Sequence, residues 1–303
     1  LTSVGYDLTF ATALVAVSGS LGIIIPPSIP YIMYCNASGA SISELFLAGF
    51  LPGVLIALCL MVYSYIYCKI HGEDKDKLNA KCMELRAKGL GTVLKEGFWA
   101  LMSPVIILGG IYGGICSPTE AATISIFYSL IVSLFIYRTI KIRDLPKIML
   151  EGIHSYAPIL IILSAAVAFA RVITLMNVAT IVSEAVLSAI SSKVVILLLI
   201  NVLLLFVGMI MDTGPAILVF TPVLLPVAEA IGVDPIHFGI IMCVNLAIGF
   251  VTPPMGANLF VASNLSKVSV FDIARKAVPF ILAFLIALLL ITFEPQISMF
   301  LLQ

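Results

Sequence analysis

Two short stretches of this sequence decide its fold. Residues 20–28 read SLGIIIPPS, and residues 247–255 read AIGFVTPPM. Both follow the pattern G-x-x-x-P-P inside a long apolar run, where a helix is expected. Because a Pro-Pro pair removes two backbone donors and its rings clash with the preceding turn, each stretch predicts a helix that breaks at the pair.

The sequence around the two stretches also matches. An aspartate lies 15 residues before each glycine, at Asp7 and Asp234, and another proline lies 25 residues after each pair, at Pro52 and Pro279. A chance Pro-Pro pair is common, but a shared context of this length is not. We therefore predict an internal repeat, and the loop charges described below give its two copies opposite directions across the membrane.

The breaks have a direct chemical consequence. Carbonyl groups of residues 22–25 and 249–252 lose their intrahelical donors, which in lipid is unfavourable unless the break is buried in protein or lines a wet cavity. Free carbonyls suit a hard cation such as sodium, and the N-termini of half-helices suit an anionic group. A simple proline kink is the alternative, and two matching breaks favour a binding site over it.

The composition is typical of an integral membrane protein. Of the 303 residues, 61% are hydrophobic and 11% are charged, too few charges to cover a soluble fold. The net charge is zero, so we expect no nucleic-acid partner. The six cysteines form no C-x-x-C motif and are interpreted as apolar residues in lipid. The chain opens at Leu1 without Met, and we expect an amino-terminal part to precede it.

Eight apolar segments are long enough to place helices in a bilayer. Two S-x-x-E motifs, at residues 41–44 and 117–120, predict helix starts. The predicted spans are residues 8–34 (interrupted), 45–67, 98–116, 121–137, 153–176, 194–225 (interrupted), 236–261 (interrupted) and 278–300.

Basic residues predict the orientation of these spans. The loops within residues 69–95, 138–147 and 267–276 are rich in Lys and Arg, so we expect them to be cytoplasmic. Residues 117–120 and 232–235 contain neither and are predicted to be external.

The orientation is consistent only if residues 194–225 enter from outside and return. We predict a re-entrant hairpin with its tip near residues 208–215, where Asp212 lies in an apolar setting. A carboxylate at this depth is a functional candidate. The alternative role for Asp212, a cap for the second arm of the hairpin, is compatible with it.

Six motifs spread over nearly the whole chain resemble the large membrane subunit of tripartite ATP-independent periplasmic (TRAP) transporters. Their order along the chain is also that of the family. They are GSLGIIIPPSIP (19–30), LAGFLP (47–52), YGGICSPTEAA (112–122), GMIMDTGPAILVFTPVLLP (208–226), DPIHFGIIM (234–242) and NLAIGFVTPPMGANLFVAS (245–263).

The resemblance implies an all-α integral membrane fold with inverted repeats, a re-entrant helical hairpin and broken helices, working as an elevator. The domains implied are a transport-domain broken helix lacking its hairpin (1–40), scaffold helices with a cytoplasmic linker at 69–97 (41–176), the second hairpin and broken helix (177–265), and a terminal scaffold helix (266–303).

The resemblance also implies a function and partners. Members of the family import organic anions, typically dicarboxylates or sialic acids, using a sodium gradient across the bacterial inner membrane. They work in membrane lipid with a small membrane subunit and an extracytoplasmic solute-binding protein, and no organic cofactor is implied. The family's sodium sites carry over to Gly22, Ile25 and Pro27 for one ion, and to Gly208, Gly249, Thr252 and Met255 for another.

We predict the solute site where the hairpin tip, at Asp212 and Thr213, approaches the two breaks near Ser28 and Asn258. An anionic solute would need the donors of Ser28 and Asn258 and the half-helix dipoles, because no Lys or Arg lies at these positions. The Asp212 carboxylate suits hydroxyl or amine groups of a solute, or holds the tip in place.

Two other functions are weighed against this one. A sodium–anion symporter of similar fold that needs no binding protein is the main alternative. An intramembrane enzyme is disfavoured, because the apolar segments contain no His/Glu zinc motif, no G-x-S-x-G motif and no aspartate pair.

Overall fold

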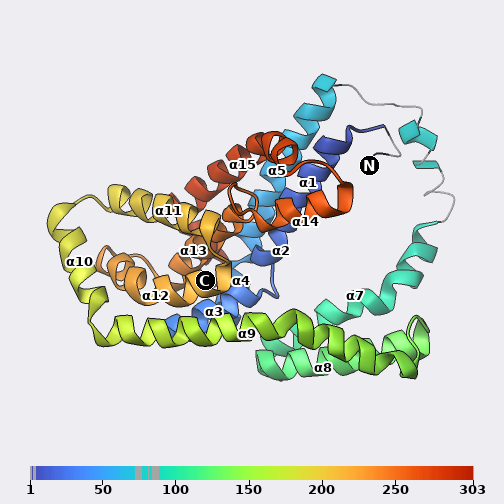
Figure 1. Cartoon of the computed structure of the whole chain (residues 1–303), viewed down its shortest axis with the longest axis horizontal. Helices are drawn as coiled ribbons and strands as arrows, with labels where there is room; N and C mark the ends of the chain where they lie inside the picture. The colour runs from blue at the N-terminus through green and yellow to red at the C-terminus, as the bar shows by residue number, and fades with distance from the viewer. Residues whose placement is uncertain (1, 3–4, 72–76, 81, 84–88, 303) are drawn as a thin grey trace. The chain divides into compact units, whose positions relative to one another are not determined.

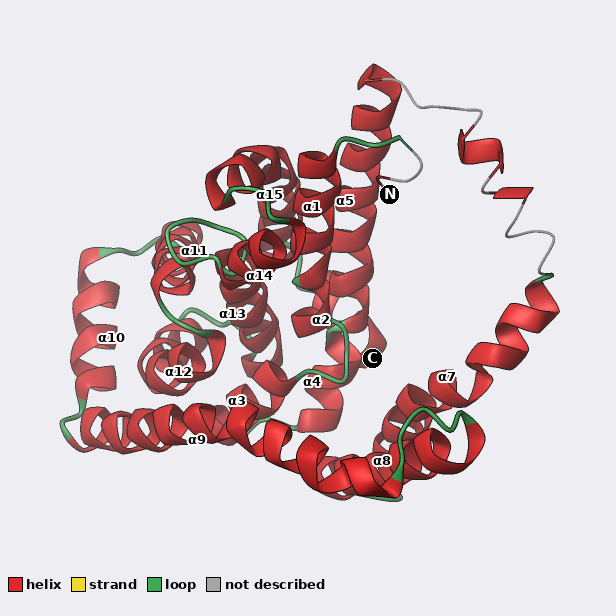
Figure 2. Cartoon of the chain, turned by 45° about the vertical axis from the view of Figure 1, so that its right-hand side comes forward, coloured by secondary structure: helices red, strands yellow, loops and turns green. Residues whose placement is uncertain are grey.

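The computed structural model describes Thr2 and residues 5–71, 77–80, 82–83 and 89–302. These described residues form helices and no strand (Figures 1 and 2). Eight helical segments among them are apolar and long enough to cross a bilayer by length and composition. The prediction of an all-α, multi-pass membrane protein is therefore confirmed. The chain forms two compact units, one made of Leu1–Asp74 and Ala165–Gln303, the other of Lys75–Ser164.

The first broken helix opens the first unit. The Asp7 carboxylate accepts a hydrogen bond from the N–H of Phe10 at 2.9 Å and caps α1 (Leu8–Gly19). A single turn, α2 (Leu21–Ile24), leads to the prolines, after which α3 (Ile29–Ser38) begins. The predicted break at residues 26–27 is confirmed.

The second broken helix is built in the same way. Asp234 Oδ1 accepts hydrogen bonds from the N–H groups of Ile236 at 2.7 Å and His237 at 3.4 Å, and so caps α13 (Pro235–Gly249). Non-helical backbone follows, and α14 (Ala257–Ser266) completes the segment. The two aspartates that match in the sequence are thus the caps of the two broken helices.

Two helices form the predicted hairpin. α11 (Lys193–Ile210) and α12 (Thr213–Ala230) are separated at residues 211–212. The Lys193 ammonium, at the start of α11, donates to the carbonyl of Gly232, just past the end of α12, at 3.1 Å. The outer ends therefore lie together, and two antiparallel helices meeting near Asp212 are confirmed. Each helix has 18 residues, and its depth in the bilayer stays a prediction.

Helix α13 is the centre of the first unit. Every residue from Ile236 to Gly249 is buried. It packs against α3, α11, α12 and α15 (Val270–Phe293), and α15 packs in turn on α1 and α5 (Phe50–His71). A helix covered on all sides needs no polar face, which is why its sequence has no amphipathic period. The unit also contains α4 (Ile42–Ala48), α10 (Val178–Ala189) and α16 (Gln296–Met299).

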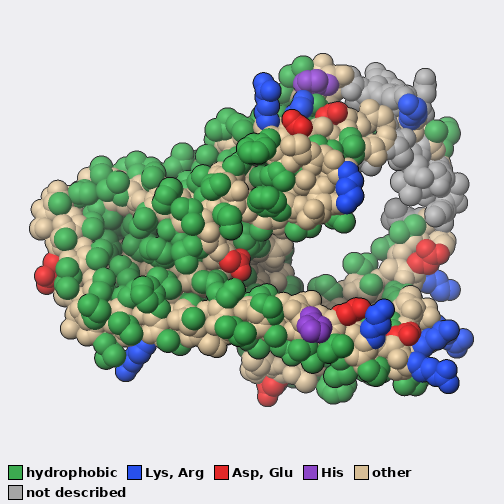
Figure 3. All heavy atoms as spheres, in the orientation of Figure 1, with side chains coloured by type: hydrophobic (Ala, Val, Ile, Leu, Met, Phe, Trp, Pro, Cys, Tyr) green, Lys and Arg blue, Asp and Glu red, His purple; other side chains and the backbone are tan. Residues whose placement is uncertain are grey.

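The outer surface of this unit is apolar. Hydrophobic side chains cover much of the face over α11 in Figure 3. On α11 itself, Val202 is 64% exposed and Phe206 is 60% exposed. Large apolar side chains in such numbers are expected where a surface meets lipid.

The second unit contains α7 (Leu90–Tyr112), α8 (Pro118–Ile131) with a π-helical turn at Val132–Ile136, and the first part of α9 (Leu145–Leu175). Two tyrosine hydroxyls join α7 to the α8 segment. Tyr128 donates to the carbonyl of Trp99 at 2.7 Å, and Tyr137 donates to the carbonyl of Glu96 at 2.6 Å.

Both S-x-x-E motifs start helices. Glu120 Oε2 accepts from the N–H of Ser117 at 2.7 Å, and Ser117 Oγ accepts from the N–H of Glu120 at 3.4 Å, which completes a capping box for α8. Ser41 Oγ accepts from the N–H of Glu44 at 3.4 Å and caps α4. Both predicted helix starts are confirmed.

Several predicted boundaries are wrong. α7 begins at Leu90 instead of 98, α9 at Leu145 instead of 153, and α15 ends at Phe293 instead of 300. The helix α10, which replaces a predicted connection, was not expected. A hydrophobicity criterion misses the polar first turns of α7 and α9, which can extend beyond the hydrocarbon layer, whereas α15 ends early because Pro295 follows it. Part of the predicted linker at 69–97, namely residues 72–76, 81 and 84–88, lies outside the described residues.

Candidate functional site

The first break frees two backbone carbonyls, and one of them finds a new hydrogen-bond donor. In an unbroken helix, Gly22 and Ile23 would accept from residues 26 and 27, but both are prolines without an N–H. The Ser28 hydroxyl donates to the Ile23 carbonyl instead. Ser28 is 2% exposed, so this hydroxyl supplies a donor where water cannot.

The Gly22 carbonyl is left without an intrahelical donor. The N–H of Ile25, the remaining candidate, bonds to the carbonyl of Leu21 at 2.8 Å. Gly22 is itself exposed, and a Cβ built on it would meet no atom within 4 Å. An unpartnered carbonyl beside open space is a suitable ligand for a cation.

At the second break, the equivalent carbonyls accept hydrogen bonds from backbone N–H groups. Gly249 accepts from the N–H of Thr252 at 3.0 Å, and Phe250 accepts from the N–H of Asn258 at 3.0 Å. Phe250 follows Gly249 as Ile23 follows Gly22 in the first break. One carbonyl is thus satisfied by a side-chain hydroxyl, and its counterpart by a backbone N–H.

Thr252 adds a hydroxyl to the second break. Its Oγ1 donates to the carbonyl of Ile248 at 2.8 Å, and the side chain is half-buried. A hydroxyl that donates one hydrogen bond keeps two lone pairs on oxygen. Thr252 can therefore offer oxygen to a cation while it remains bonded to α13.

The end of α11 and the second break are in backbone contact. A Cβ built on Gly208 would lie 3.1 Å from the Cα of Leu246 and 3.3 Å from the Cα of Gly249. A Cβ on Gly249 would overlap the carbonyl of Gly208. The N–H of Met255 also donates to the carbonyl of Met209 at 3.2 Å. The four residues predicted for the second ion, Gly208, Gly249, Thr252 and Met255, therefore lie on two segments in direct contact.

Asp212 caps the second arm of the hairpin. Its Oδ1 accepts from the N–H of Thr213 at 2.8 Å at the start of α12. The Asp212 side chain is exposed, whereas Thr213 is 6% exposed. The carboxylate keeps lone pairs that are accessible from outside the protein, so capping and a role toward a solute are compatible.

The two broken helices lie antiparallel along each other. Asn258, at the start of α14, donates through Nδ2 to the carbonyl of Ala16 at 3.1 Å and to Ser20 Oγ at 3.2 Å near the end of α1. The Tyr34 hydroxyl, near the end of α3, donates to the carbonyl of Pro235 at 2.6 Å at the start of α13. Opposite ends of the two segments therefore meet.

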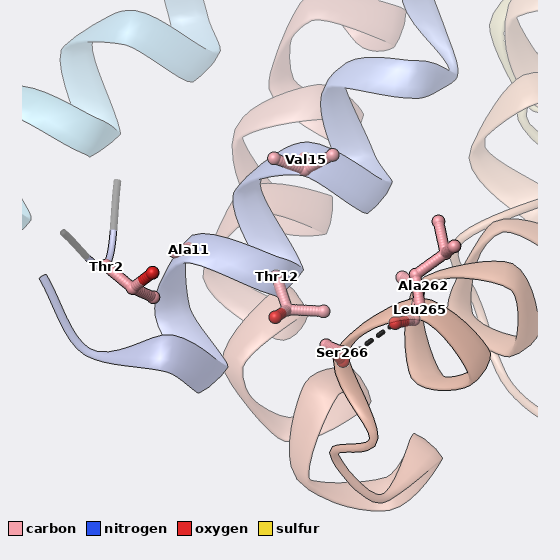
Figure 4. Close-up of a pocket in the computed structure, with 7 residues that line it drawn as sticks. All are labelled: Thr2, Ala11, Thr12, Val15, Ala262, Leu265 and Ser266. Carbon is pink, nitrogen blue, oxygen red and sulfur yellow. Dashed lines mark hydrogen bonds between the residues drawn. The ribbon is translucent and has the colours of Figure 1, made fainter.

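A cavity of about 330 Å³ lies between α1 and α14 (Figure 4). Thr12 Oγ1 donates to the carbonyl of Leu8 at 2.7 Å and Ser266 Oγ to the carbonyl of Ala262 at 2.7 Å, so these hydroxyls serve their own helices. Residues early in α1 and late in α14 share its wall, which agrees with the antiparallel arrangement. Its lining is Thr2, Ala11, Thr12, Val15, Ala262, Leu265 and Ser266.

The structure joins some predicted site residues and leaves others apart. Asn258 bonds to the first broken helix, and the hairpin contacts the second break. Within the described residues, no hydrogen bond joins Ser28 to Asp212 or to Asn258. Gly22, Ile25 and Pro27 are all exposed at the first break. The assignment of these residues to sodium and solute stays a prediction.

A buried chain of polar side chains was not predicted. His237 Nε2 lies 3.4 Å from the carbonyl of Thr292, Asn201 Nδ2 donates to Thr292 Oγ1 at 3.1 Å, and Asn245 Nδ2 donates to Asn201 Oδ1 at 2.7 Å. All four side chains are at most 3% exposed. The signal in the sequence is a single asparagine inside each of two apolar runs.

The donor set at the breaks limits the chemistry. Among the described residues, no group of three or more His, Cys, Asp or Glu is placed to hold a metal ion. Carbonyl and hydroxyl oxygens are the ligands on offer at the two breaks, and these suit a hard monovalent cation better than a transition metal.

Comparison with known proteins identifies the family. The family model for the "Tripartite ATP-independent periplasmic transporter, DctM component" matches residues 1–297. The chain belongs to this family. The resemblance to TRAP large subunits is confirmed, and the DctM family is one of transporter components rather than enzymes.

Three relatives illustrate the family. The isethionate TRAP transporter permease protein DctMQ of Oleidesulfovibrio alaskensis is 44% identical over 299 residues, which are 98% of this chain and 46% of that protein. The C4-dicarboxylate TRAP transporter large permease protein DctM of Pseudomonas aeruginosa is 38% identical, over 97% of this chain and 68% of that protein. The sialic acid TRAP transporter large permease protein SiaM of Vibrio cholerae is 35% identical, over 98% and 68%. The chain thus spans between about half and two thirds of these relatives.

Proposed function

We propose that the protein containing this chain is a sodium-coupled importer of a small organic anion. It would act in the bacterial inner membrane as the large subunit of a TRAP transporter. A small membrane subunit and an extracytoplasmic solute-binding protein would complete the system. Family membership supports the transporter class, and the arrangement of the two breaks supports the coupling to a cation.

The breaks are the observation on which the sodium proposal rests. Each lies in an apolar broken-helix segment and frees backbone carbonyls, and the Gly22 carbonyl has no intrahelical donor. Thr252 adds a hydroxyl oxygen beside the carbonyls of the second break. Broken helices of this kind coordinate sodium in secondary transporters. We assign one ion to Gly22, Ile25 and Pro27, and a second to Gly208, Gly249, Thr252 and Met255.

The antiparallel contact between the broken helices supports an inverted repeat. Asp7 and Asp234 cap equivalent helices, and opposite ends of the two segments meet at Tyr34 and Pro235. A repeat of this kind allows one half to move against a fixed partner and expose the same site on either side. We propose elevator-type transport on this basis.

The solute is proposed to be an organic anion. The relatives named above are permeases for isethionate, C4-dicarboxylates and sialic acid, all of which carry acidic groups. Ser28 and Asn258 border the breaks as hydrogen-bond donors, and Asp212 and Thr213 open α12. The N-terminus of α12 would add a favourable dipole for a negative charge.

Uptake into proteoliposomes tests this function. The full-length protein would be reconstituted with a small TRAP subunit and supplied with each candidate anion, with and without a TRAP solute-binding protein. We expect uptake that requires both an inward sodium gradient and the binding protein. Sodium-driven uptake without the binding protein would favour the independent symporter. Uptake that is indifferent to replacing sodium by potassium would contradict the proposal.

A further inference from the structure

A single polar side chain interrupts the apolar face of α11. Between Lys193 and Gly208, every residue except Asn201 is apolar. Asn201 is 3% exposed, and its Oδ1 accepts from Nδ2 of Asn245 on α13 at 2.7 Å. Its own Nδ2 donates to Thr292 Oγ1 on α15 at 3.1 Å. Three helices thus share one hydrogen-bond chain inside an apolar core.

These hydrogen bonds lie on the same helix faces as the contact between Gly208 and Gly249. Asn201 precedes Gly208 by seven residues, and Asn245 precedes Gly249 by four. These separations are about two turns and one turn of helix, so each asparagine lies on the same side of its helix as its glycine. Because residue 201 pairs with 245 and residue 208 contacts 249, α11 and α13 run parallel.

Apolar packing alone defines this register poorly. The other side chains of α11 before Gly208 are Val, Ile, Leu and Phe, which pack similarly after a shift of one turn, about 5.4 Å. The contact between Gly208 and Gly249 tolerates no such shift. The backbones are so close that a Cβ on Gly249 would overlap Gly208, and a shift would bring a residue with a Cβ to this place. Paired buried asparagines can specify the register of packed helices, at some cost in stability.

One acceptor of the asparagine pair also has no hydrogen-bond partner among the described residues. Asn245 Nδ2 makes a second bond to the carbonyl of Ile241 at 2.8 Å, but Asn245 Oδ1 is buried and has no partner among the described residues. A buried acceptor without a hydrogen-bond partner destabilises a core, so packing stability alone does not explain it. The arrangement suits a function in positioning better than one in stability.

We propose that the chain of Asn201, Asn245 and Thr292 is the positioning element of the second cation site. By fixing α11 against α13, it holds Gly208 against Gly249 and keeps the break beside Met209 and Thr252 in the geometry that binds the ion. This inference rests on the proposed sodium coupling. None of the three residues belongs to the ligand set proposed for the ion, so in this proposal they act through the glycine contact.

Leucine substitutions separate positioning from stability. Asn201→Leu and Asn245→Leu each leave a buried polar partner, whereas the double variant replaces both by apolar groups of similar size. The experiment measures unfolding temperature against sodium concentration for the full-length protein in detergent, with choline chloride holding the ionic strength. A ligand at free concentration L that binds only the folded state stabilises it by RT ln(1 + L/Kd), so the sodium concentration needed for a given rise in unfolding temperature reports the Kd.

We expect the single variants to unfold at lower temperature and the double variant to recover in the absence of sodium. All three should need about tenfold more sodium than the wild-type protein for the same rise in unfolding temperature, which is typical when the partners of metal ligands are removed. Thr292→Val, which keeps the asparagine pair, should give a smaller increase in the same direction. Thr221→Val is the matched control: its buried hydroxyl joins α12 to Met242 Sδ of α13 at 3.3 Å and should leave the sodium dependence unchanged.

The outcomes distinguish two failures. If the double variant regains both stability and the wild-type dependence of unfolding temperature on sodium, the asparagines only fill space and the positioning role is overturned. If the double variant does not fold, an unchanged sodium dependence in Thr292→Val overturns it equally. If the wild-type protein shows no sodium-dependent stabilisation at all, sodium coupling itself is wrong and the positioning role falls with it.

Discussion

The two broken helices share a sequence pattern but differ in what surrounds the break. At the second break, Gly249 meets the backbone of Gly208, and Met255 bonds to Met209. At the first, a side chain, Ser28, satisfies the freed carbonyl of Ile23, whereas the counterpart carbonyl of Phe250 at the second accepts from a backbone N–H. The pattern G-x-x-x-P-P therefore determines where the backbone breaks, and the residues that follow it determine how the freed carbonyls are satisfied.

The backbone contact at the second break makes Gly249 the position with the largest expected effect. Gly249→Ala should abolish sodium-dependent uptake, because its Cβ would overlap a backbone that cannot move aside. Overpacking of this kind destabilises by about 1–3 kcal/mol. Uptake assays and thermal unfolding of Gly249→Ala decide this, and wild-type uptake would show that the close contact between the two glycines is not required.

Substitution of Asp212 at the hairpin tip should have the next largest effect on uptake. Asp212→Ala should abolish uptake while the protein still inserts and assembles, because the lost cap costs only about 1 kcal/mol. Asp212→Asn should retain part of the activity if hydrogen bonding matters more than charge, since an amide oxygen still accepts from the N–H of Thr213. The measurement is uptake in proteoliposomes with the binding protein and a sodium gradient. Full uptake by Asp212→Ala would exclude the tip from the mechanism.

The freed carbonyls provide a smaller contrast. Ser28→Ala removes the only donor to the Ile23 carbonyl among the described residues, which should cost about 1–3 kcal/mol and lower the unfolding temperature by several degrees. Ser64→Ala is a suitable control, because Ser64 also donates to a carbonyl, that of Leu60 at 2.8 Å, but within an unbroken helix. Equal unfolding temperatures for the two variants would show that Ile23 needs no partner.

No side-chain mutation gives the same effect at the second break. The Phe250 carbonyl accepts from the backbone N–H of Asn258, which survives substitution of the side chain. Asn258→Ala should instead weaken the contact between the broken helices, by losing its bonds to Ala16 and Ser20.

Features that depend on local backbone chemistry could be predicted from the sequence. The Pro-Pro pairs predicted both breaks. The S-x-x-E motif at Ser117 predicted the start of α8. In each case the signal and its consequence lie within a few residues of each other.

Features that depend on which helix faces meet could not be predicted. α13 is buried on every side, so its sequence has no period to indicate that Asn245 faces Asn201. The contact of Gly208 with Gly249 and the bond from Asn258 to Ala16 join residues distant in sequence, and no local pattern encodes them. The division of the chain into scaffold and transport domains stays a prediction for the same reason.

The central claim is that these breaks bind sodium, and Thr252 tests it most directly. Thr252→Val removes a hydroxyl oxygen beside the carbonyl of Gly249 while keeping the shape of the side chain, and Thr252→Ser restores the oxygen. The measurement is the sodium half-saturation of uptake in proteoliposomes at equal amounts of inserted protein. We predict a rise of about tenfold for Thr252→Val and a value near wild type for Thr252→Ser. An unchanged half-saturation in Thr252→Val would contradict a cation site at the second break.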